Sequence, residues 1–243
     1  LKTTAPIDFE PDASAGKRGL TVVVADLRAF SSLAERQLPQ ELIGLLNRFF
    51  DEMGQAITAH EGRIDAFYGD GFMAVFGLEG TPGRGAQAAI AAAGDIVRAV
   101  DALNREYGAA LPLPLRIGIG IHTGDAITGA VENDNLGRRE ITVGETVMVA
   151  SQLESATRRV LADIVVSEDT IRASGRSYAG TTALKIAIKG REKPLTAYGF
   201  ASAPEIARRK REDVAVPVPV VAGGELTASA EVVQEQGETG EKD

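Results

Sequence analysis

Residues 68–77 read Tyr-Gly-Asp-Gly-Phe-Met-Ala-Val-Phe-Gly, and this stretch does most to decide the fold. Asp70 stands between two glycines, with the short run Arg63–Tyr68 before it and Phe72–Phe76 after it. Two short runs of apolar and aromatic residues joined by a glycine-containing turn predict a β-hairpin. The glycines permit a tight turn and the close approach of another backbone. Asp70 is therefore predicted at the tip of this hairpin.

A buried strand and two helices are predicted around the hairpin. Leu20–Ala25, LTVVVA, has apolar residues at both odd and even positions, and most of them are β-branched. This pattern is typical of a strand covered on both faces. Leu33–His60 carries leucine, phenylalanine, methionine and isoleucine at three- and four-residue spacing, which predicts a long amphipathic helix closed by Gly62. The alanine-rich residues 86–107 predict a second helix. The element order is strand, helix, hairpin, helix.

Further strands and a helix follow. Leu115–His122 and Ala126–Val131 predict two strands around Gly124, with a short strand at Glu140–Val143 and a helix at Glu145–Arg158 after them. A strand at 164–166, a short helix and a hairpin through Lys189-Gly190-Arg191 complete the pattern. Helices that cover a mixed sheet place the chain in the α/β or α+β class.

The pattern also divides the chain. We expect residues 1–19 to be a linker or N-terminal arm, residues 20–200 a globular domain, and residues 201–243 a flexible, acidic tail. The tail begins with a basic run, Arg208–Arg211, which is either a contact for an acidic partner or a solvated helix end, the second being the more usual. With 243 residues, of which 44% are hydrophobic and 25% charged, the chain can bury a full core.

Composition excludes several classes of function. The net charge of −8 argues against broad electrostatic binding of nucleic acid or anionic lipid. The absence of cysteine excludes a disulfide framework, a thiolate metal site and a cysteine nucleophile, and it fits a cytoplasmic protein. No apolar run approaches the length of about 18 residues that indicates a membrane span. Because the sequence starts at Leu1 without Met, we expect a fragment of a longer protein, such as the cytoplasmic part of a membrane-attached one with an upstream regulatory domain.

Two aspartates stand where chemistry is expected. Asp26 follows the buried strand and precedes a helix start at Ser31 or Ser32, so its carboxylate is predicted at a strand end beside free backbone N–H groups. If Asp26 and Asp70 meet, they form a paired-carboxylate site for Mg²⁺ or Mn²⁺. Read singly, Asp26 is equally well a helix cap and Asp70 an ordinary turn residue.

Five segments, in order over about residues 20–200, resemble the catalytic domain of class III adenylate and guanylate cyclases. They are the first metal motif Ala25–Ser31, the second metal motif Tyr68–Gly77, the core strand Arg116–Gly124, the base-recognition strand and helix Ile141–Val147, and the closing Lys189–Pro194. Five ordered blocks are far more specific than any one of them. The resemblance implies a ferredoxin-like βαββαβ core with helices packed on a mixed sheet.

The resemblance also implies an activity. In the family, a homodimer with active sites at its interface converts a nucleoside triphosphate to a 3′,5′-cyclic nucleotide and pyrophosphate. Asp26 and Asp70, with the adjoining Leu27, match the residues that hold two Mg²⁺ or Mn²⁺ ions, and Phe30 and Thr142 fall at nucleotide-binding positions. We expect ATP as substrate and a lyase reaction by in-line phosphoryl transfer.

Three positions depart from the family pattern. Ala66 stands where the family has a base-reading Lys, while Met148 and Gln152 replace an Asn and an Arg on the helix after Thr142. The preceding loop, 143–145, is one residue shorter. Since the missing Arg neutralises charge in phosphoryl transfer, its loss predicts poor turnover. Two functions stay open, a weak or atypical cyclase and a catalytically inactive pseudo-cyclase that acts as a dimerising, nucleotide-binding regulatory module.

Other polar residues have two interpretations or none. Arg138 and Arg139 are either substitutes for the missing Arg or residues of a solvated loop, the second being the more usual role. Arg116 either faces the triphosphate or forms a structural ion pair. His60 and His122 have no partner at metal-ligand spacing, so both are interpreted as structural.

Overall fold

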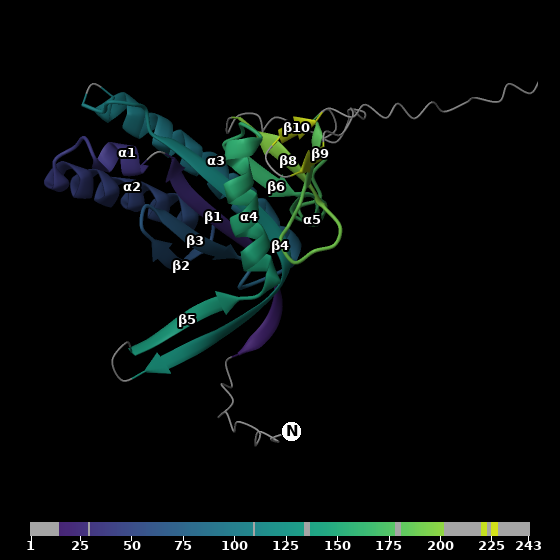
Figure 1. The fold of residues 1–243 in the computed structure, drawn as a ribbon. Helices are drawn as coiled ribbons and strands as arrows, with labels where there is room; N and C mark the ends of the chain where they lie inside the picture. The colour runs from purple at the N-terminus through teal and green to yellow at the C-terminus, as the bar shows by residue number, and fades with distance from the viewer. Residues whose placement is uncertain are drawn as a thin grey trace, which may run out of the picture.

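The computed structural model describes residues 15–28, 30–108, 110–133, 137–177, 181–201, 220–222 and 225–227. The strands are β1 Gly16–Arg28, β2 Arg63–Tyr68, β3 Gly71–Phe76, β4 Arg116–Asn133, β5 Gly137–Val143, β6 Ile164–Ser167, β7 Ala183–Ile186, β8 Leu195–Phe200, β9 Val220–Ala222 and β10 Glu225–Thr227. The helices are α1 Phe30–Ala34, α2 Pro39–Ala59, α3 Pro82–Tyr107, α4 Glu145–Arg159 and α5 Glu168–Ala173. Figure 1 shows these elements arranged around one twisted sheet.

The sheet has the strand order β10-β9-β7-β8-β6-β4-β1-β3-β2, with β5 paired to β4 off this path. Its central part, β4-β1-β3-β2, is antiparallel, whereas β6 joins β4 in parallel. In chain order the central elements are β1, α2, β2, β3, α3 and β4. The predicted βαββαβ core on a mixed sheet is therefore confirmed.

Apolar residues of β1 pack on both faces of the sheet. Val23 and Ala25 belong to the large core cluster that contains residues of α2 and α3. Val22 and Val24 belong to a separate cluster that includes Ala150 of α4. Successive side chains of a strand point to opposite faces of the sheet. A run that is apolar at every position therefore needs a layer of helices on each face. The sheet is covered by α2 and α3 on one face and by α4 on the other.

The long helix predicted over Leu33–His60 is divided in two. The chain forms α1, leaves the helical conformation, and resumes it with Pro39 at the start of α2. A proline fits the first helical turn but disfavours the helical conformation in the residue before it. The apolar periodicity was correct, and the position of Pro39 was the signal for the break.

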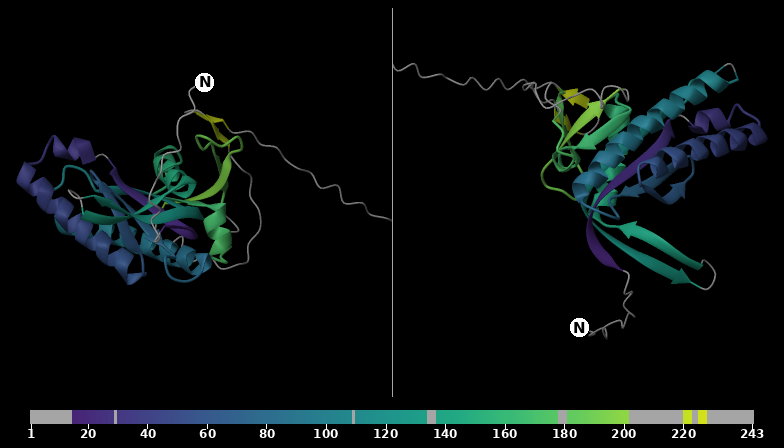
Figure 2. Two further views of the ribbon diagram at one scale, coloured as in Figure 1. Left: turned by 90° about the horizontal axis from the view of Figure 1, so that it is seen from below. Right: turned by 180° about the vertical axis from the view of Figure 1, so that it is seen from behind.

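The two strands predicted around Gly124 are one continuous strand. β4 runs from Arg116 to Asn133 without a turn, and a Cβ added at Gly124 would lie 2.8 Å from Oγ1 of Thr146 in α4. Gly124 therefore permits the close approach of the helix. The outer half of β4 pairs with β5, and this hairpin projects from the body of the domain (Figures 1 and 2). We call residues 125–143 the arm.

The two ends of the chain differ in detail from the prediction. β1 begins at Gly16, before the predicted Leu20, and its first residues pair with the base of the arm. In the predicted tail, Val220–Ala222 lies beside β7 and Glu225–Thr227 pairs with it as a hairpin, while Arg208–Arg211 lies outside the described residues. None of the helices in the described part of the chain has the length and apolar composition needed to cross a bilayer.

Candidate functional site

Asp26 and Asp70 lie at neighbouring ends of β1 and β3. The antiparallel register places Asp26 opposite Gly71, the residue directly after Asp70. Asp70 itself lies in the turn between β2 and β3, as predicted for a hairpin tip. A Cβ added at Gly71 would lie 2.7 Å from the carbonyl oxygen of Ala25 and 2.8 Å from Oδ1 of Asp26. The hairpin tip thus approaches the strand end as closely as a glycine allows.

The electrostatics of Asp26 reflect this proximity. The pKa of its carboxyl is raised above the usual value, first by burial and then by the negative charge of Asp70. Arg158, from the last turn of α4, opposes the rise through an ion pair of 3.0 Å with Oδ2 of Asp26. Two carboxylates that repel each other and a single guanidinium partner define a site that favours additional positive charge.

A third acid of the site, Glu154, comes from α4 and adds to the negative charge. Glu154 is 7% exposed, and its Oε1 has no hydrogen-bond partner among the described residues. That oxygen lies 2.6 Å from where a Cβ on Gly118 would be, and Gly118 is the β4 partner of Asp26. The pKa of Glu154 is raised by burial and then by Asp26. Burial, and then the charges of Asp26, Asp65 and Glu154, raise the pKa of Tyr68 to about 12.

These groups fit a divalent metal ion that is shared with a substrate. Among the described residues there is no group of three or more His, Cys, Asp or Glu side chains that could hold a metal by itself. Mg²⁺, however, is commonly bound by one or two carboxylates together with water and substrate phosphates. The β1–β3 ladder ends at the Asp26–Gly71 pair, so Leu27 follows directly beyond it with its side chain buried. Asp26 and Asp70 are the carboxylates that could supply hard oxygen ligands to such a shared site.

The predicted nucleotide-binding residues Ala66 and Thr142 lie on strands β2 and β5, which Asp65 connects. The backbone N–H of Thr142 donates to Oδ2 of Asp65 over 2.7 Å, and Oδ1 of Asp65 pairs with Arg63 at the same distance. Thr142 is buried, and its Oγ1 has no partner in the described part of the chain. Ala66 lies where the register of β2 against β3 shifts, between Ile64 and Ala66. Asp65 was not singled out from the sequence.

The positions that lack the family's Asn and Arg lie on one face of α4. Met148 is 39% exposed. Oε1 of Gln152 accepts a hydrogen bond of 2.7 Å from the backbone N–H of Lys189. Nearby, Nε of Arg191 pairs with Oε1 of Glu145 at 2.6 Å. The loop between β7 and β8 therefore lies against the same helix that carries both replaced positions.

None of the three arginines considered as substitutes, Arg138, Arg139 and Arg116, lies on this face. Arg138 and Arg139 are opposite Glu132 and Val131 on the arm, next to Asn133–Gly137, the last pair of the hairpin. Arg116 forms an ion pair of 3.0 Å with Asp163. Of the two interpretations of Arg116, this is the structural ion pair.

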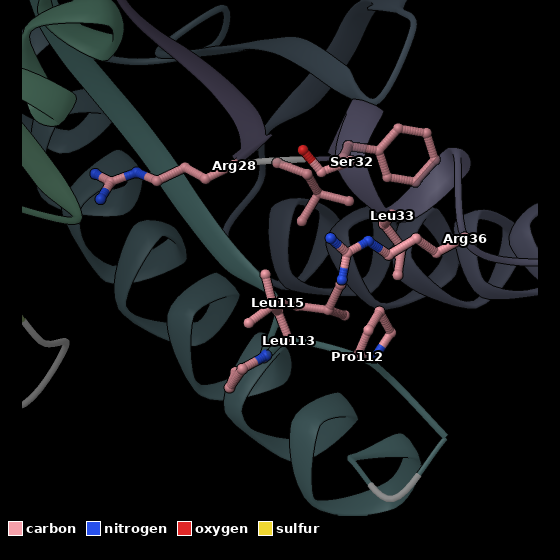
Figure 3. Close-up of a pocket in the computed structure, with 10 residues that line it drawn as sticks. Arg28, Ser32, Leu33, Arg36, Pro112, Leu113 and Leu115 are labelled. Carbon is pink, nitrogen blue, oxygen red and sulfur yellow. The ribbon is translucent and has the colours of Figure 1, made fainter.

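A small pocket lies beside the end of β1. It has a volume of about 130 Å³ and is lined by Leu27, Arg28, Phe30, Ser32, Leu33, Arg36 and Pro112–Leu115. Figure 3 shows Arg36 reaching between Leu33 and Leu115, while the side chain of Arg28 points away from them. Arg28 instead pairs with Asp163 at 3.6 Å. Phe30 packs against the large core cluster, so the segment after Asp26 is anchored by its aromatic ring.

The two histidines have structural partners. Nδ1 of His122 lies 2.8 Å from the buried Oγ of Ser167, and burial lowers the pKa of His122 to about 4. Nε2 of His60 lies 2.6 Å from Oδ2 of Asp95, which joins the end of α2 to α3. His122 lies opposite Val22, four residues along β1 from Asp26.

Comparisons with known proteins agree on one family. The family described as "Adenylate and Guanylate cyclase catalytic domain" matches residues 14–201. An adenylate cyclase of Anabaena cylindrica is 30% identical over 76% of this chain and 37% of its own length. Adenylate cyclase 1 of Rhizobium meliloti is 30% identical over 60% of this chain and 22% of its own length. The chain thus spans well under two thirds of these relatives.

Solved structures show the same fold. The adenylyl cyclase CyaB from P. aeruginosa superposes with a TM-score of 0.68 at 28% identity, over 76% of this chain and 94% of that one. A guanylyl cyclase structure superposes with a TM-score of 0.69 at 30% identity, over 78% of this chain and 94% of that one. The chain is thus similar to both adenylyl and guanylyl cyclases.

Proposed function

The chain belongs to the family of adenylate and guanylate cyclase catalytic domains, and from this premise we propose that it converts ATP slowly to 3′,5′-cyclic AMP and pyrophosphate. The observation that carries the proposal is the convergence of Asp26 and Asp70, where burial and then the charge of Asp70 raise the pKa of Asp26. Such a pair is suited to holding divalent cations against a triphosphate. Mg²⁺ or Mn²⁺, two ions per site, is the proposed cofactor.

The residues of the site have distinct tasks in this proposal. Asp26, Asp70 and the backbone of Leu27 would hold the cations, which when bound neutralise phosphate charge and promote attack by a hydroxyl. The 3′-oxygen of the ribose forms a bond to the α-phosphorus, the bond to the bridging oxygen breaks, pyrophosphate leaves, and the hydroxyl proton passes to solvent. Phe30 anchors the segment that follows Asp26. Thr142 lies on β5, the strand that is proposed to recognise the base of the nucleotide.

The turnover is proposed to be slow because groups that act on the base, the ribose and the transition state are missing. Ala66 has no donor for a base, Met148 has no amide, and Gln152 has no charge. An arginine that stabilises phosphoryl-transfer charge is worth about 10³–10⁵ in rate. Binding of the metal and the triphosphate depends on other residues and is retained.

We place the working site between two copies of the chain. Arg158, beside Asp26, and Glu145, at the other end of α4, are separated by about 20 Å at the usual helical rise. The residues around Glu145 therefore reach an Asp26–Asp70 pair only in another subunit. The arm exposes the apolar side chains Ile127, Val131, Ile141 and Val143, which suit a two-fold, head-to-tail homodimer. Sedimentation with Mn²⁺ and nucleotide should give a dimer, and a strict monomer at high concentration would contradict this arrangement.

The activity is tested by measuring cyclic nucleotide formation from ATP, GTP, CTP and UTP with Mn²⁺. The parent should form cyclic AMP at a low rate, and Asp26→Asn should abolish it. Asp101→Asn, at an exposed position of α3, is the matched control and should leave the rate unchanged.

The alternative is an inactive pseudo-cyclase that dimerises and binds the nucleotide, which the replaced residues Ala66, Met148 and Gln152 favour. It predicts that the parent binds Mn²⁺ and triphosphate without forming any cyclic nucleotide from the four substrates. That result would overturn the proposed enzymatic activity and leave a binding module.

A further inference from the structure

Asp65 is a buried acid that joins β2 to the arm. It is the residue of β2 without a partner in β3, at the point where the register shifts between Ile64 and Ala66. An extra residue in one strand re-aims a side chain relative to the regular alternation. The side chain of Asp65 is 2% exposed, and it accepts two hydrogen bonds of 2.7 Å, from the guanidinium of Arg63 and from the backbone N–H of Thr142. The register shift therefore directs a carboxylate from the body of the domain onto β5.

This contact fixes β5 at the one residue that the strand buries. Thr142 is 3% exposed, whereas every other residue of β5 is exposed. In an edge strand, the N–H groups that point away from the sheet have no backbone partner. The carboxylate of Asp65 supplies such a partner to Thr142, and a second bond, from Arg63 to Glu140, ties the same stretch of β5 to β2. The position of Thr142 relative to β2 is thus set by Asp65.

The side chain of Thr142 is left with an unused hydrogen-bonding group. Its Oγ1 is buried and has no partner among the residues that the structure describes. Buried polar groups in native proteins nearly always have a partner, so an unpaired one indicates a ligand, an ion or a water molecule. A hydroxyl both donates and accepts, which suits the ring nitrogens and exocyclic groups of a purine. Asp65 therefore occupies the backbone of Thr142 and leaves its hydroxyl for the nucleotide.

We propose that Asp65 is a positioning residue of the base site, which holds the backbone of Thr142 so that its hydroxyl meets the base of the nucleotide. The inference rests on the proposed function and gives Asp65 a part in the recognition of the base. Because Ala66 supplies no donor, fewer groups contact the base, and the placement of the remaining hydroxyl matters more. The competing explanation is that Asp65 only ties the arm to the domain and contributes stability. The two explanations differ in whether the effect of Asp65 depends on the base.

Two probes, one with a base and one without, separate these explanations and need no turnover. They are α,β-methylene ATP, which cannot release pyrophosphate, and inorganic triphosphate, each measured with Mn²⁺ by calorimetry on the full chain. Asp65→Leu should weaken the binding of α,β-methylene ATP about fivefold, the value of one hydrogen bond, and should leave the binding of triphosphate unchanged. Asp65→Asn keeps an oxygen that accepts the N–H of Thr142 but loses the charge that pairs with Arg63, so its affinity should fall between those of Asp65→Leu and the parent.

A double substitution tests whether Asp65 acts through Thr142. Thr142→Val removes the hydroxyl alone and should also weaken the binding of α,β-methylene ATP about fivefold. If the two residues act as one unit, Asp65→Leu combined with Thr142→Val should lose about fivefold in affinity, and not the roughly 25-fold expected of independent sites. An additive loss would contradict action through Thr142.

The matched control is Asp125→Asn, which removes the ion pair of 2.8 Å between Lys17 and Asp125 at the base of the arm. That ion pair also joins the arm to the body of the domain, but it involves neither Asp65 nor Thr142. Asp125→Asn should therefore keep the affinity of the parent for both probes. Sedimentation should show that the variants and the control remain dimers.

The outcomes distinguish the inference from the proposed function. An equal loss of affinity for both probes in Asp65→Leu and Asp65→Asn, or no loss for either probe, would overturn the inference and leave a structural tie. A parent that binds α,β-methylene ATP no more tightly than triphosphate would contradict recognition of the base by Thr142, and the inference with it. A parent that binds both probes as expected but shows no turnover contradicts the cyclase activity alone, and the binding series still decides the role of Asp65.

Discussion

Arg158 donates a hydrogen bond of 3.0 Å to Oδ2 of Asp26, so the last turn of α4 occupies a carboxylate that is proposed to bind metal. A cation entering the site competes with this guanidinium. The side chain of Arg158 is 58% exposed, so the competition is screened by solvent and modest.

Replacing Arg158 with Met should therefore tighten Mn²⁺ binding by about two- to fivefold at low salt, with a smaller effect at high salt. Titration of the protein with Mn²⁺, followed by electron paramagnetic resonance, measures this directly. Arg159→Met changes the neighbouring exposed position of the same helix and should have no effect. Weaker Mn²⁺ binding in Arg158→Met would show that the arginine supports the metal site.

Gly71→Ala should disrupt the site through a single methyl group. The added Cβ would lie 2.7 Å from the backbone oxygen of Ala25, which cannot move without displacing β1, and it would also push on Asp26. We expect the free energy of unfolding to fall by about 1–3 kcal/mol and Mn²⁺-dependent turnover to be lost. Gly44→Ala, on an exposed part of α2 with open space around it, should keep both. Full metal affinity in Gly71→Ala would contradict the close approach of the two strand ends.

The buried acid Glu154 should make stability depend on pH. Its pKa is raised in the folded protein, so the folded state binds this proton more tightly than the unfolded state does. The contribution of Glu154 to the free energy of unfolding is therefore unchanged below about pH 4.5, its ordinary pKa, and falls as the pH rises through the folded pKa. Asp26 acts in the same direction from about pH 3.8.

Glu154→Gln removes this loss, so urea unfolding should show a smaller decrease in stability between about pH 4.5 and pH 7 than in the parent. The control Glu35→Gln, at an exposed position, should keep the parent profile. Identical pH profiles for Glu154→Gln and the parent would show that the carboxyl is not responsible.

Restoring the three family residues should raise turnover much more than binding. In the variant Ala66→Lys, Met148→Asn, Gln152→Arg, the restored groups act mainly on the base, the ribose and the transition state. We expect kcat to rise at least 10-fold, with Mn²⁺ affinity unchanged. The bond between Gln152 and Lys189 is lost in this variant, and the loop before α4 is short, so the gain stays below that of a complete site. Robust parent activity, unchanged by the three substitutions, would mean that other residues already perform the functions of the missing Lys, Asn and Arg.

The sequence predicted those parts of the fold that local pattern determines. The run Leu20–Ala25, predicted to be buried on both faces, forms part of the central strand β1, and helices cover both faces of it. Pro39, which starts α2, was passed over inside the predicted helix Leu33–His60. Gly124 was misread as a turn because its role depends on context, since it admits Thr146 beside a continuous strand. Periodicity alone does not distinguish a glycine in a turn from a glycine under a helix.

The residues of the candidate site were likewise predicted only in part. Asp26 and Asp70 were predicted from their places at the ends of elements, and the register of β1 and β3 brings them together. Asp65 and Arg158 were missed because their partners, Thr142 and Asp26, are 77 and 132 residues away. Glu154 left one signal in the sequence, a charged residue next to Leu153 on the buried side of α4, where an acid needs a specific reason.

The most direct test of the account is to locate Mn²⁺ by anomalous diffraction in crystals grown with α,β-methylene ATP. We expect manganese between the carboxylates of Asp26 and Asp70 of one subunit, in contact with the triphosphate, and Arg158 released from Asp26. Manganese bound elsewhere, with Asp26 still paired to Arg158 and no triphosphate at the two aspartates, would contradict the central claim that this pair forms the metal site.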